Sequence, residues 1–226
     1  MKQLLLNLAA IPEPSFANFA VGKNHELTAL LAMLARGDNR ERFVYIWGEK
    51  GAGKSHLLRA LTAAVASPPR SLGGAASVPE IGAIAADETV LFDDVDRISS
   101  ASQPALFHAY NRLRTGRGRL IATGGVPPAH LTLLADLKSR LAWGMVMQVH
   151  SLSDEEKLNT LEQHATERGF KLSPEVIRYI FLHQSRDLPS LIQLLAALDQ
   201  YSLETKRAIT VPLLKEMLDN NSFAES

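Results

Sequence analysis

Gly48-Glu49-Lys50-Gly51-Ala52-Gly53-Lys54-Ser55 matches the pattern G-x-x-x-x-G-K-[ST] at every fixed position. An apolar, strand-like run, Phe43–Trp47, precedes it, and a helical pattern over Lys54–Ala66 follows it. Glycines let the backbone curl so that successive N–H groups face a phosphate, and a helix N-terminus adds the positive end of its dipole. We interpret the segment as a phosphate-binding loop. The alternative is a glycine-rich strand-to-helix turn without a ligand.

The chemistry of such a loop assigns roles to single residues. We expect Lys54 to reach the β- and γ-phosphates of a nucleotide and the Ser55 hydroxyl to ligate Mg²⁺. The next residue, His56, offers its backbone N–H to phosphate. The full set of expected phosphate-binding residues is Gly48, Gly51, Ala52, Gly53, Lys54, Ser55 and His56.

A second motif lies downstream, where the apolar strand-like run Thr89–Phe92 ends in the paired carboxylates of Asp93 and Asp94. Beside a phosphate-binding loop, Asp93 is expected to hold Mg²⁺ through water. Asp94 could polarise the water that attacks the phosphate, or it could simply cap the following helix. Both interpretations of Asp94 stay open at this point.

Strand-like and helical patterns alternate through the first 150 residues. The strand-like runs are Phe43–Trp47, Thr89–Phe92, Leu120–Thr123 and Val146–Val149, and the other helical patterns are His25–Ala35 and Gln103–Thr115. This alternation predicts a parallel sheet wrapped by helices. Small residues and prolines at 67–76 predict a loop or a poor edge strand there.

Strand signals stop after His150, and helix signals continue to the end. Ser153 and three following acidic residues predict a helix start, and Gly169 predicts its end. Further helices are predicted from Ser173-Pro174, over Leu188–Leu203 and over 212–218, with a frayed tail at 220–226. We therefore expect an N-terminal tail (1–14), an α/β domain (15–150) and a small helical domain (151–226).

Composition excludes several classes of protein. Lys plus Arg number 24 and Asp plus Glu number 24, so no overall positive field would hold the chain on DNA or on an anionic membrane. We expect no direct sequence-specific DNA binding. The chain has no cysteine, which excludes disulfides and Cys-based zinc sites. The N-terminal apolar run is short and interrupted by Asn7, so we expect a cytoplasmic protein rather than one with a signal peptide.

With both motifs in place, the chain resembles the DnaA-related branch of the AAA+ ATPases over nearly its whole length. Phe16–Gly22 resembles the entry segment that packs on adenine in that branch, and it contributes Val21 to the expected nucleotide site. Leu137–Gly144 resembles the arginine-finger segment of the branch, with Arg140 as the finger. The resemblance implies a P-loop AAA+ domain, a small all-α lid domain, and ADP or ATP with Mg²⁺ as cofactors.

The two sensor positions of this branch also have counterparts in the sequence. Arg186 stands where the family carries the sensor-2 arginine, and Thr123 stands at the sensor-1 position, where a polar side chain could touch the γ-phosphate or the attacking water. Gly124-Gly125 follow, where an acidic residue is common, so we expect weak or no intrinsic ATP hydrolysis. Two alternatives remain for the arginines: Arg140 could form a surface ion pair with Asp136, and Arg186 could be a solvated charge beside Asp187.

DnaA-type initiators continue beyond the lid into a helix-turn-helix DNA-binding domain, whereas this sequence stops at about the end of the lid. It therefore resembles the Hda-type regulatory inactivators of DnaA, which work with the DNA polymerase sliding clamp. Gln3-Leu4-Leu5-Leu6-Asn7-Leu8 is similar to bacterial clamp-binding peptides, although Asn7 departs from the proline often found there. The clamp-binding residues implied are Gln3, Leu4, Leu6 and Leu8. Alternatively, these leucines fold back on their own domain.

The resemblance implies a negative regulator of replication initiation that binds ADP and, with the DNA-loaded clamp, stimulates hydrolysis of DnaA-bound ATP through Arg140 in trans. The same edge of the domain could join copies of this chain into a homo-oligomer. Two rivals stay open: an AAA+ ATPase that loads a helicase or assists a transposase, and a non-catalytic nucleotide-gated scaffold. We interpret Trp47 and Trp143 as packing residues rather than base-stacking platforms.

Overall fold

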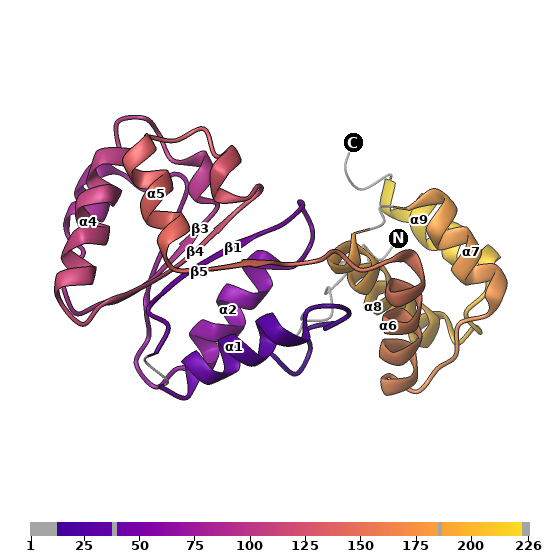
Figure 1. Cartoon of the computed structure of the whole chain (residues 1–226). Coiled ribbons are helices and arrows are strands. Elements are labelled where there is room, and N and C mark those ends of the chain that lie inside the picture. The colour runs from indigo at the N-terminus through magenta and orange to yellow at the C-terminus, as the bar shows by residue number, and fades with distance from the viewer. Residues whose placement is uncertain (1–12, 38–39, 185–186, 223–226) are drawn as a thin grey trace. The chain divides into compact units, whose positions relative to one another are not determined.

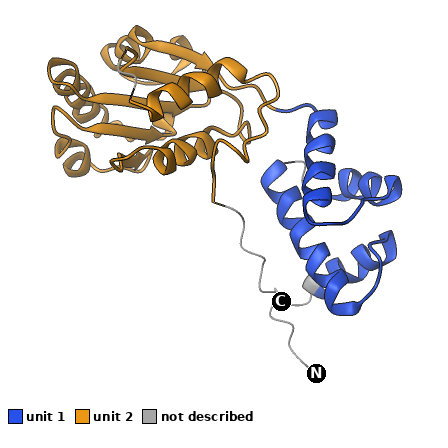
Figure 2. Ribbon diagram, turned by 90° about the horizontal axis from the view of Figure 1, so that it is seen from below, with its two compact units in different colours: residues 1–12, 152–226 blue, residues 13–151 orange. Residues whose placement is uncertain are grey.

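The computed structural model describes residues 13–37, 40–184 and 187–222. These residues form two compact units, which meet in sequence between Ser151 and Leu152 (Figure 2). Each unit has a hydrophobic core of its own. In the part of the chain that the model describes, no helix is long and apolar enough to cross a membrane.

The first unit is a five-stranded parallel sheet with helices on both faces (Figure 1). The strand order is β2-β3-β4-β1-β5, and every neighbouring pair is parallel. The strands are β1 (Phe43–Trp47), β2 (Arg70–Gly73), β3 (Thr89–Asp93), β4 (Arg119–Gly124) and β5 (Met145–Gln148). The helices are α1 (His25–Ala35), α2 (Lys54–Ala64), α3 (Val78–Gly82), α4 (Gln103–Thr115) and α5 (Ala135–Trp143), with 3₁₀ turns η1 (Val95–Arg97) and η2 (Pro128–His130). The predicted parallel sheet flanked by helices is confirmed.

The three inner strands β1, β3 and β4 have apolar centres because their side chains are buried on both faces of the sheet. Successive side chains of a strand point to opposite faces, and β1 shows the consequence: Tyr45 joins the core under α4 and α5, while Val44 and Ile46 join the core under α1 and α2. Such near-continuous apolar runs are typical of parallel sheets covered by helices. The phosphate-binding loop leaves the end of β1, an inner strand paired on both sides with β4 and β5, and therefore starts from a rigid base.

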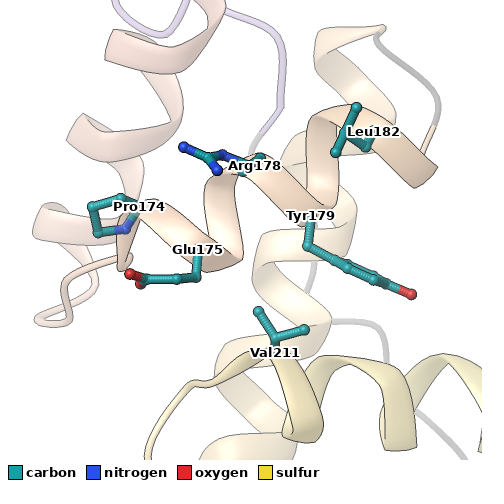
Figure 3. A pocket seen from close by; sticks show the side chains of 6 residues that line it. All are labelled: Pro174, Glu175, Arg178, Tyr179, Leu182 and Val211. Atoms are coloured by element: carbon teal, nitrogen blue, oxygen red, sulfur yellow. The ribbon is translucent and has the colours of Figure 1, made fainter.

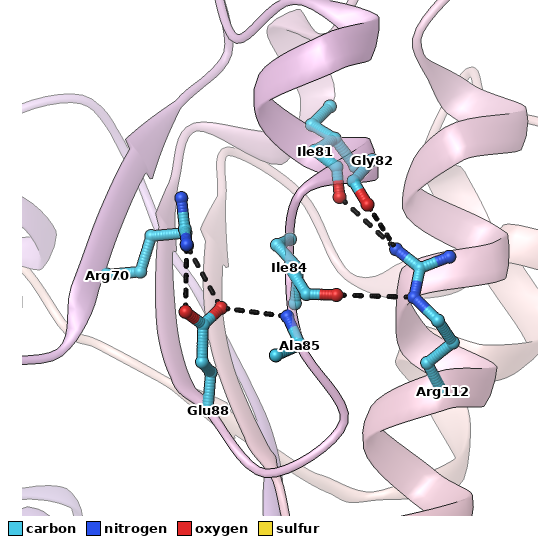
Figure 4. A network of polar contacts seen from close by, with 7 residues as sticks. All are labelled: Arg70, Ile81, Gly82, Ile84, Ala85, Glu88 and Arg112. Carbon is cyan, nitrogen blue, oxygen red and sulfur yellow. Dashed lines mark hydrogen bonds and ion pairs between the residues drawn. The ribbon is translucent and has the colours of Figure 1, made fainter.

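The segment predicted as a loop or poor edge strand is the edge strand β2. It is fixed by Glu88, whose carboxylate accepts hydrogen bonds from Arg70 Nε and Nη2 at 3.0 and 2.8 Å and from the Ala85 N–H at 3.0 Å (Figure 4). On the neighbouring helix α4, Arg112 donates to the carbonyl oxygens that end α3, including that of Gly82 at 3.1 Å. The guanidinium satisfies carbonyl groups that a short helix leaves unpaired.

Two helices of the first unit were not predicted. Helix α3 has only five residues, too few to display a helical period, and a capping box between Ser77 and Glu80 starts it. Helix α5 carries the arginine-finger resemblance, and Leu137 and Leu141 bury its inner side. Its four-residue spacing of leucines is the signal that could have indicated a helix.

The second unit consists of helices alone, as expected for a lid: α6 (Asp154–Glu167), α7 (Pro174–His183), α8 (Leu188–Thr205) and α9 (Val211–Ser222). Ser153 and Ser173 cap α6 and α7 as predicted, and Gly169 adopts a positive φ of 86° just after α6. The frayed tail predicted from Asn220 is wrong for its first three residues, because α9 continues to Ser222. The Asn220 side chain donates to the Tyr201 hydroxyl at 3.2 Å, which ties that turn to α8.

Candidate functional site

The predicted phosphate-binding loop connects β1 to α2. Gly51 and Gly53 have φ values of 84° and 98°, in the left-handed region that side chains disfavour. A Cβ atom at Gly51 would meet nothing within 4 Å, whereas one at Gly53 would lie 2.7 Å from the Phe19 ring. The loop is therefore curled, open at Gly51 and closely covered at Gly53. Such a curl followed by a helix N-terminus is the backbone arrangement that binds phosphate groups.

Lys54 lies within this loop and is only 8% exposed. Its ammonium group donates to the carbonyl oxygens of Gly48 at 2.8 Å and Glu49 at 3.0 Å. A lysine ammonium has three donors, so these two bonds fix the charge at the loop and leave one donor for an anion. Gly48 is held in turn, because its N–H donates to the Gly124 carbonyl at 3.2 Å.

The segment expected at the adenine side packs against this loop. The ring centroids of Phe19 and His56 lie 5.4 Å apart, and His56 Nε2 is 3.0 Å from the Ser15 carbonyl oxygen. The His56 side chain thus joins α2 to the entry segment, a contact that its expected backbone role did not include. Val21 is half-buried, and its carbonyl accepts the Asn24 N–H at 2.8 Å.

Asn24 is a residue that the sequence reasoning missed. It is 2% exposed, and its side-chain amide exchanges two hydrogen bonds with the backbone of His150: Nδ2 donates to the carbonyl at 2.9 Å and Oδ1 accepts the N–H at 2.7 Å. This pair joins the entry segment to the chain just after β5. Nothing in the sequence links positions 126 residues apart, although an asparagine directly before a helix is the kind of residue to inspect.

Thr123 brings the two carboxylate residues of the second motif together. The Thr123 hydroxyl donates to Asp93 Oδ1 at 2.5 Å and accepts the Asp94 N–H at 2.9 Å. The side chain is fully buried, and the contact exists because β3 and β4 are adjacent parallel strands that end together. The expected sensor-1 position therefore lies in direct contact with the expected metal position.

Asp94 itself has a positive φ of 50°, a conformation that aspartate tolerates better than most residues. Its side chain makes no capping hydrogen bond to η1, and its carboxylate lies 3.7 Å from the Arg97 guanidinium. The capping interpretation of Asp94 is therefore not supported. Both groups are well exposed, so this ion pair is weak.

A neighbouring side chain explains why position 124 is a glycine. A Cβ atom there would lie 2.2 Å from the Tyr45 hydroxyl, which donates to the Val126 carbonyl at 2.7 Å. Burial raises the pKa of Tyr45, and the nearby Asp96 carboxylate raises it further, so the phenol stays a donor at neutral pH. Asp96 also accepts the Gly125 N–H at 3.0 Å. With Tyr45 in place, an acidic side chain does not fit at position 124.

The residues available for a metal suit magnesium on a nucleotide. Among the described residues no group of three or more His, Cys, Asp or Glu side chains could hold a metal ion. Mg²⁺ at phosphate sites needs only one or two protein oxygens, because phosphate oxygens and water complete its shell. Ser55, at the start of α2, and Asp93, at the end of β3, supply one hydroxyl and one carboxylate.

Arg140 lies near the C-terminal end of α5, away from this loop. Its guanidinium carbon is 5.7 Å from the centroid of the Phe107 ring and 5.3 Å from that of Trp143. Its Nε is buried and has no hydrogen-bond partner among the described residues. In the described segments it forms no ion pair, so the alternative pairing with Asp136 is absent there.

The two tryptophans differ in how far their side chains are buried. Trp47 is partly buried against the core, as predicted, but Trp143 is 62% exposed, so the packing interpretation is wrong for Trp143. Helix α5 ends at Trp143, and its buried residues are Leu137 and Leu141. The remaining predicted site residues, Gln3, Leu4, Leu6, Leu8 and Arg186, lie outside the described residues.

The lid has a cavity of its own, of about 260 Å³, between α7 and the start of α9 (Figure 3). Tyr179, Leu182 and Val211 supply its apolar side chains, and Glu175 and Arg178 its charged ones. None of the predicted site residues lines it. The phosphate-binding loop and this cavity therefore belong to different units.

Comparisons with known proteins agree with this division. Residues 154–218 match the family model of the Hda lid domain. Domain III of the replication initiation protein DnaA from Thermotoga maritima superposes with a TM-score of 0.72 at 20% sequence identity, covering 93% of this chain and 97% of that one.

AMPPCP-bound DnaA from Aquifex aeolicus superposes with a TM-score of 0.68 at 20% identity, covering 86% of this chain and 67% of that one. A RuvB mutant from Thermotoga maritima gives a TM-score of 0.67 at 16% identity, with 91% and 71% covered. At 16–20% identity these likenesses establish the fold alone. The chain therefore has the fold of domain III of DnaA, and its C-terminal unit is similar to the Hda lid domain over residues 154–218.

Proposed function

We propose that this protein binds ADP with Mg²⁺ at its phosphate-binding loop and acts as a negative regulator of DNA replication initiation by stimulating hydrolysis of DnaA-bound ATP. The observation that carries the proposal is the environment of Arg140. This cation has no local counter-ion among the described residues and a buried Nε without a hydrogen-bond partner. It stands in a chain whose lid matches that of Hda.

The nucleotide would be held by the α/β unit alone, apart from any contribution of Arg186. The curled loop at Gly51 and Gly53 and the free donor of Lys54 suit the phosphates, and Ser55 and Asp93 suit the metal. Mg²⁺, when bound, would neutralise part of the phosphate charge. Thr123 would orient the Asp93 carboxylate through its hydroxyl, while Val21 and Phe19 belong to the segment beside the loop.

Arg140 would act on a nucleotide held by another subunit. The loop leaves the end of β1, whereas Trp143 and Gly144 lie at its beginning, since a Cβ atom at Gly144 would touch the Phe43 carbonyl. Five residues of strand separate these edges by about 13 Å. An arginine at the far edge that forms no ion pair among the described residues would be suited to meet an anion that belongs to a partner.

The partner in this proposal is ATP-bound DnaA. A guanidinium brought to the γ-phosphate neutralises charge that develops during phosphoryl transfer, and such arginine fingers contribute about 10³–10⁵ in rate. Stimulated hydrolysis would convert ATP-bound DnaA to its ADP form. Gln3, Leu4, Leu6 and Leu8 would recruit the sliding clamp, an inference that rests on their sequence pattern.

Phosphate release from ATP-bound DnaA tests the proposal. The reaction contains this protein, ADP and clamp loaded on DNA, and intact protein is compared with the double variant Gln3→Ala/Leu6→Ala. We expect clamp-dependent stimulation that the double variant lacks. Substantial ATP turnover by this protein alone, with no effect on DnaA, would instead favour a helicase-loading or transposase-assisting ATPase.

A further inference from the structure

A second arginine, Arg114, contacts the same tryptophan ring as Arg140. The guanidinium carbon of Arg114, near the C-terminal end of α4, lies 4.8 Å from the Trp143 ring centroid, and that of Arg140 lies 5.3 Å from the same centroid. Two helices thus bring two cations to one exposed indole. Their separation is within about 10 Å, the Debye length at 0.1 M salt, so both charges act on the same nearby anion.

Neither Arg114 nor Arg140 forms an ion pair within residues 13–37, 40–184 and 187–222. Burial raises the pKa of the Tyr110 hydroxyl, and the charges of Arg140, Arg114 and Arg42 lower it. Three guanidiniums therefore surround one buried hydroxyl in a chain whose net charge is zero.

Within the described segments Arg42, unlike Arg114 and Arg140, uses its guanidinium in backbone hydrogen bonds. Its guanidinium donates to the carbonyl oxygens of Gly116 at 2.8 Å and Arg114 at 3.1 Å, and these bonds close the end of α4. Arg114 has no comparable bond among the described contacts; only the indole face holds it. Its hydrogen-bond donors are available to a ligand.

A cavity of about 270 Å³ adjoins this cluster. Among the described residues that line it, Arg42 and Arg114 stand beside a single carboxylate, Glu41, and Trp143 forms part of its wall. Like charges gathered around a cavity repel one another unless an anion enters. The excess of guanidinium groups therefore favours a ligand rich in phosphate or carboxylate oxygens.

We propose that Arg114 is a second anion-binding residue of the arginine-finger site and that Trp143 is the positioning residue which holds both guanidiniums toward the partner. This inference rests on the proposed function, because the anion is the nucleotide-bearing face of ATP-bound DnaA. Cation–π contact fixes a guanidinium without consuming its N–H donors. Arg140 would meet the γ-phosphate, while Arg114 would contact acidic oxygens beside it and speed docking.

The test measures stimulated hydrolysis of DnaA-bound ATP over a salt series in which the Debye length falls from about 30 Å to about 8 Å. Arg114→Gln is compared with Arg114→Lys and with Arg117→Gln, which removes the same charge from an exposed arginine three residues along the chain. We expect Arg114→Gln to lower the rate at low salt by about two- to fivefold and to flatten its salt dependence. Arg114→Lys should recover part of the loss, and Arg117→Gln should match the intact protein.

Trp143→Leu and Trp143→Phe test the shared support. Leucine removes the aromatic face and phenylalanine keeps one, so the leucine variant should lose more stimulation while its midpoint of thermal unfolding stays close to that of the intact protein. Equal effects of the two variants, or a salt profile of Arg114→Gln that matches Arg117→Gln, would overturn this inference alone. Full stimulation by Arg140→Ala would instead overturn the proposed function.

Discussion

The Thr123 hydroxyl makes two hydrogen bonds, one to each residue of the carboxylate pair. Thr123→Val keeps the shape of the side chain but leaves the Asp94 N–H and one Asp93 oxygen without this partner. We expect a loss of about 1–3 kcal/mol in the free energy of unfolding, measured by urea denaturation. Thr123→Ser keeps the hydroxyl and serves as control. Equal losses in both variants would show that the hydroxyl contributes nothing.

Gly124 is constrained by a neighbour rather than by its own φ. Gly124→Ala places a methyl group 2.2 Å from the Tyr45 hydroxyl, and overpacking of this kind costs about 1–3 kcal/mol. Gly82→Ala is the matched control, because a Cβ atom there meets nothing within 4 Å. The expected result is a lower thermal midpoint for Gly124→Ala only. If the double variant Gly124→Ala/Tyr45→Phe does not recover stability, the assigned contact is wrong.

Single residues differ in how far the sequence reveals them. The loop from Gly48 to Ser55 could be assigned because its pattern is local and its chemistry depends on backbone curl. The contact of Thr123 with Asp93 depends on the register of β3 and β4, and that of Asn24 with His150 spans 126 residues. Neither leaves a pattern in one sequence, so both had to come from the structure.

The edge strand β2 depends on Glu88. Hydrogen bonds from Arg70 hold the pKa of the Glu88 carboxyl below its ordinary value of 4.5, against the opposing effect of burial. Because the folded-state pKa is the lower one, this stabilisation is complete above pH 4.5 and is lost as pH falls through the depressed value. Glu88→Gln should therefore weaken the acid sensitivity of unfolding below pH 4.5. Parallel stability–pH curves for variant and intact protein would contradict this role.

Helices could be predicted from the sequence where they are long enough for the spacing of apolar residues to repeat. Helices α1 and α4 have the bounds that their apolar spacing predicts, His25–Ala35 and Gln103–Thr115. Helix α3 is too short for any period, and α5 begins without a side-chain cap at Leu134. The lid helices were found through Ser153, Ser173 and Gly169, whose capping roles depend only on adjacent residues.

The chain divides into two compact units between Ser151 and Leu152. A nucleotide bound in the α/β unit should therefore stabilise mainly that unit against unfolding. ADP at 100 times its Kd contributes about 2.7 kcal/mol to a folded state that binds it. We expect Lys54→Ala to abolish the rise in thermal midpoint caused by ADP and Mg²⁺. Lys50→Ala, an exposed lysine of the same loop, should keep the rise. A full rise in the Lys54 variant would place the nucleotide elsewhere.

The whole molecule, in this account, delivers one cation to the nucleotide of another protein. Single-turnover hydrolysis of ATP on DnaA tests this most directly, with intact protein, Arg140→Ala and Arg140→Lys compared in the presence of ADP and DNA-loaded clamp. We expect Arg140→Ala to lose stimulation by a factor of about 10³ or more and Arg140→Lys to recover little, while clamp binding persists in both. Stimulation that survives Arg140→Ala would contradict the account and leave a nucleotide-gated scaffold as the better description.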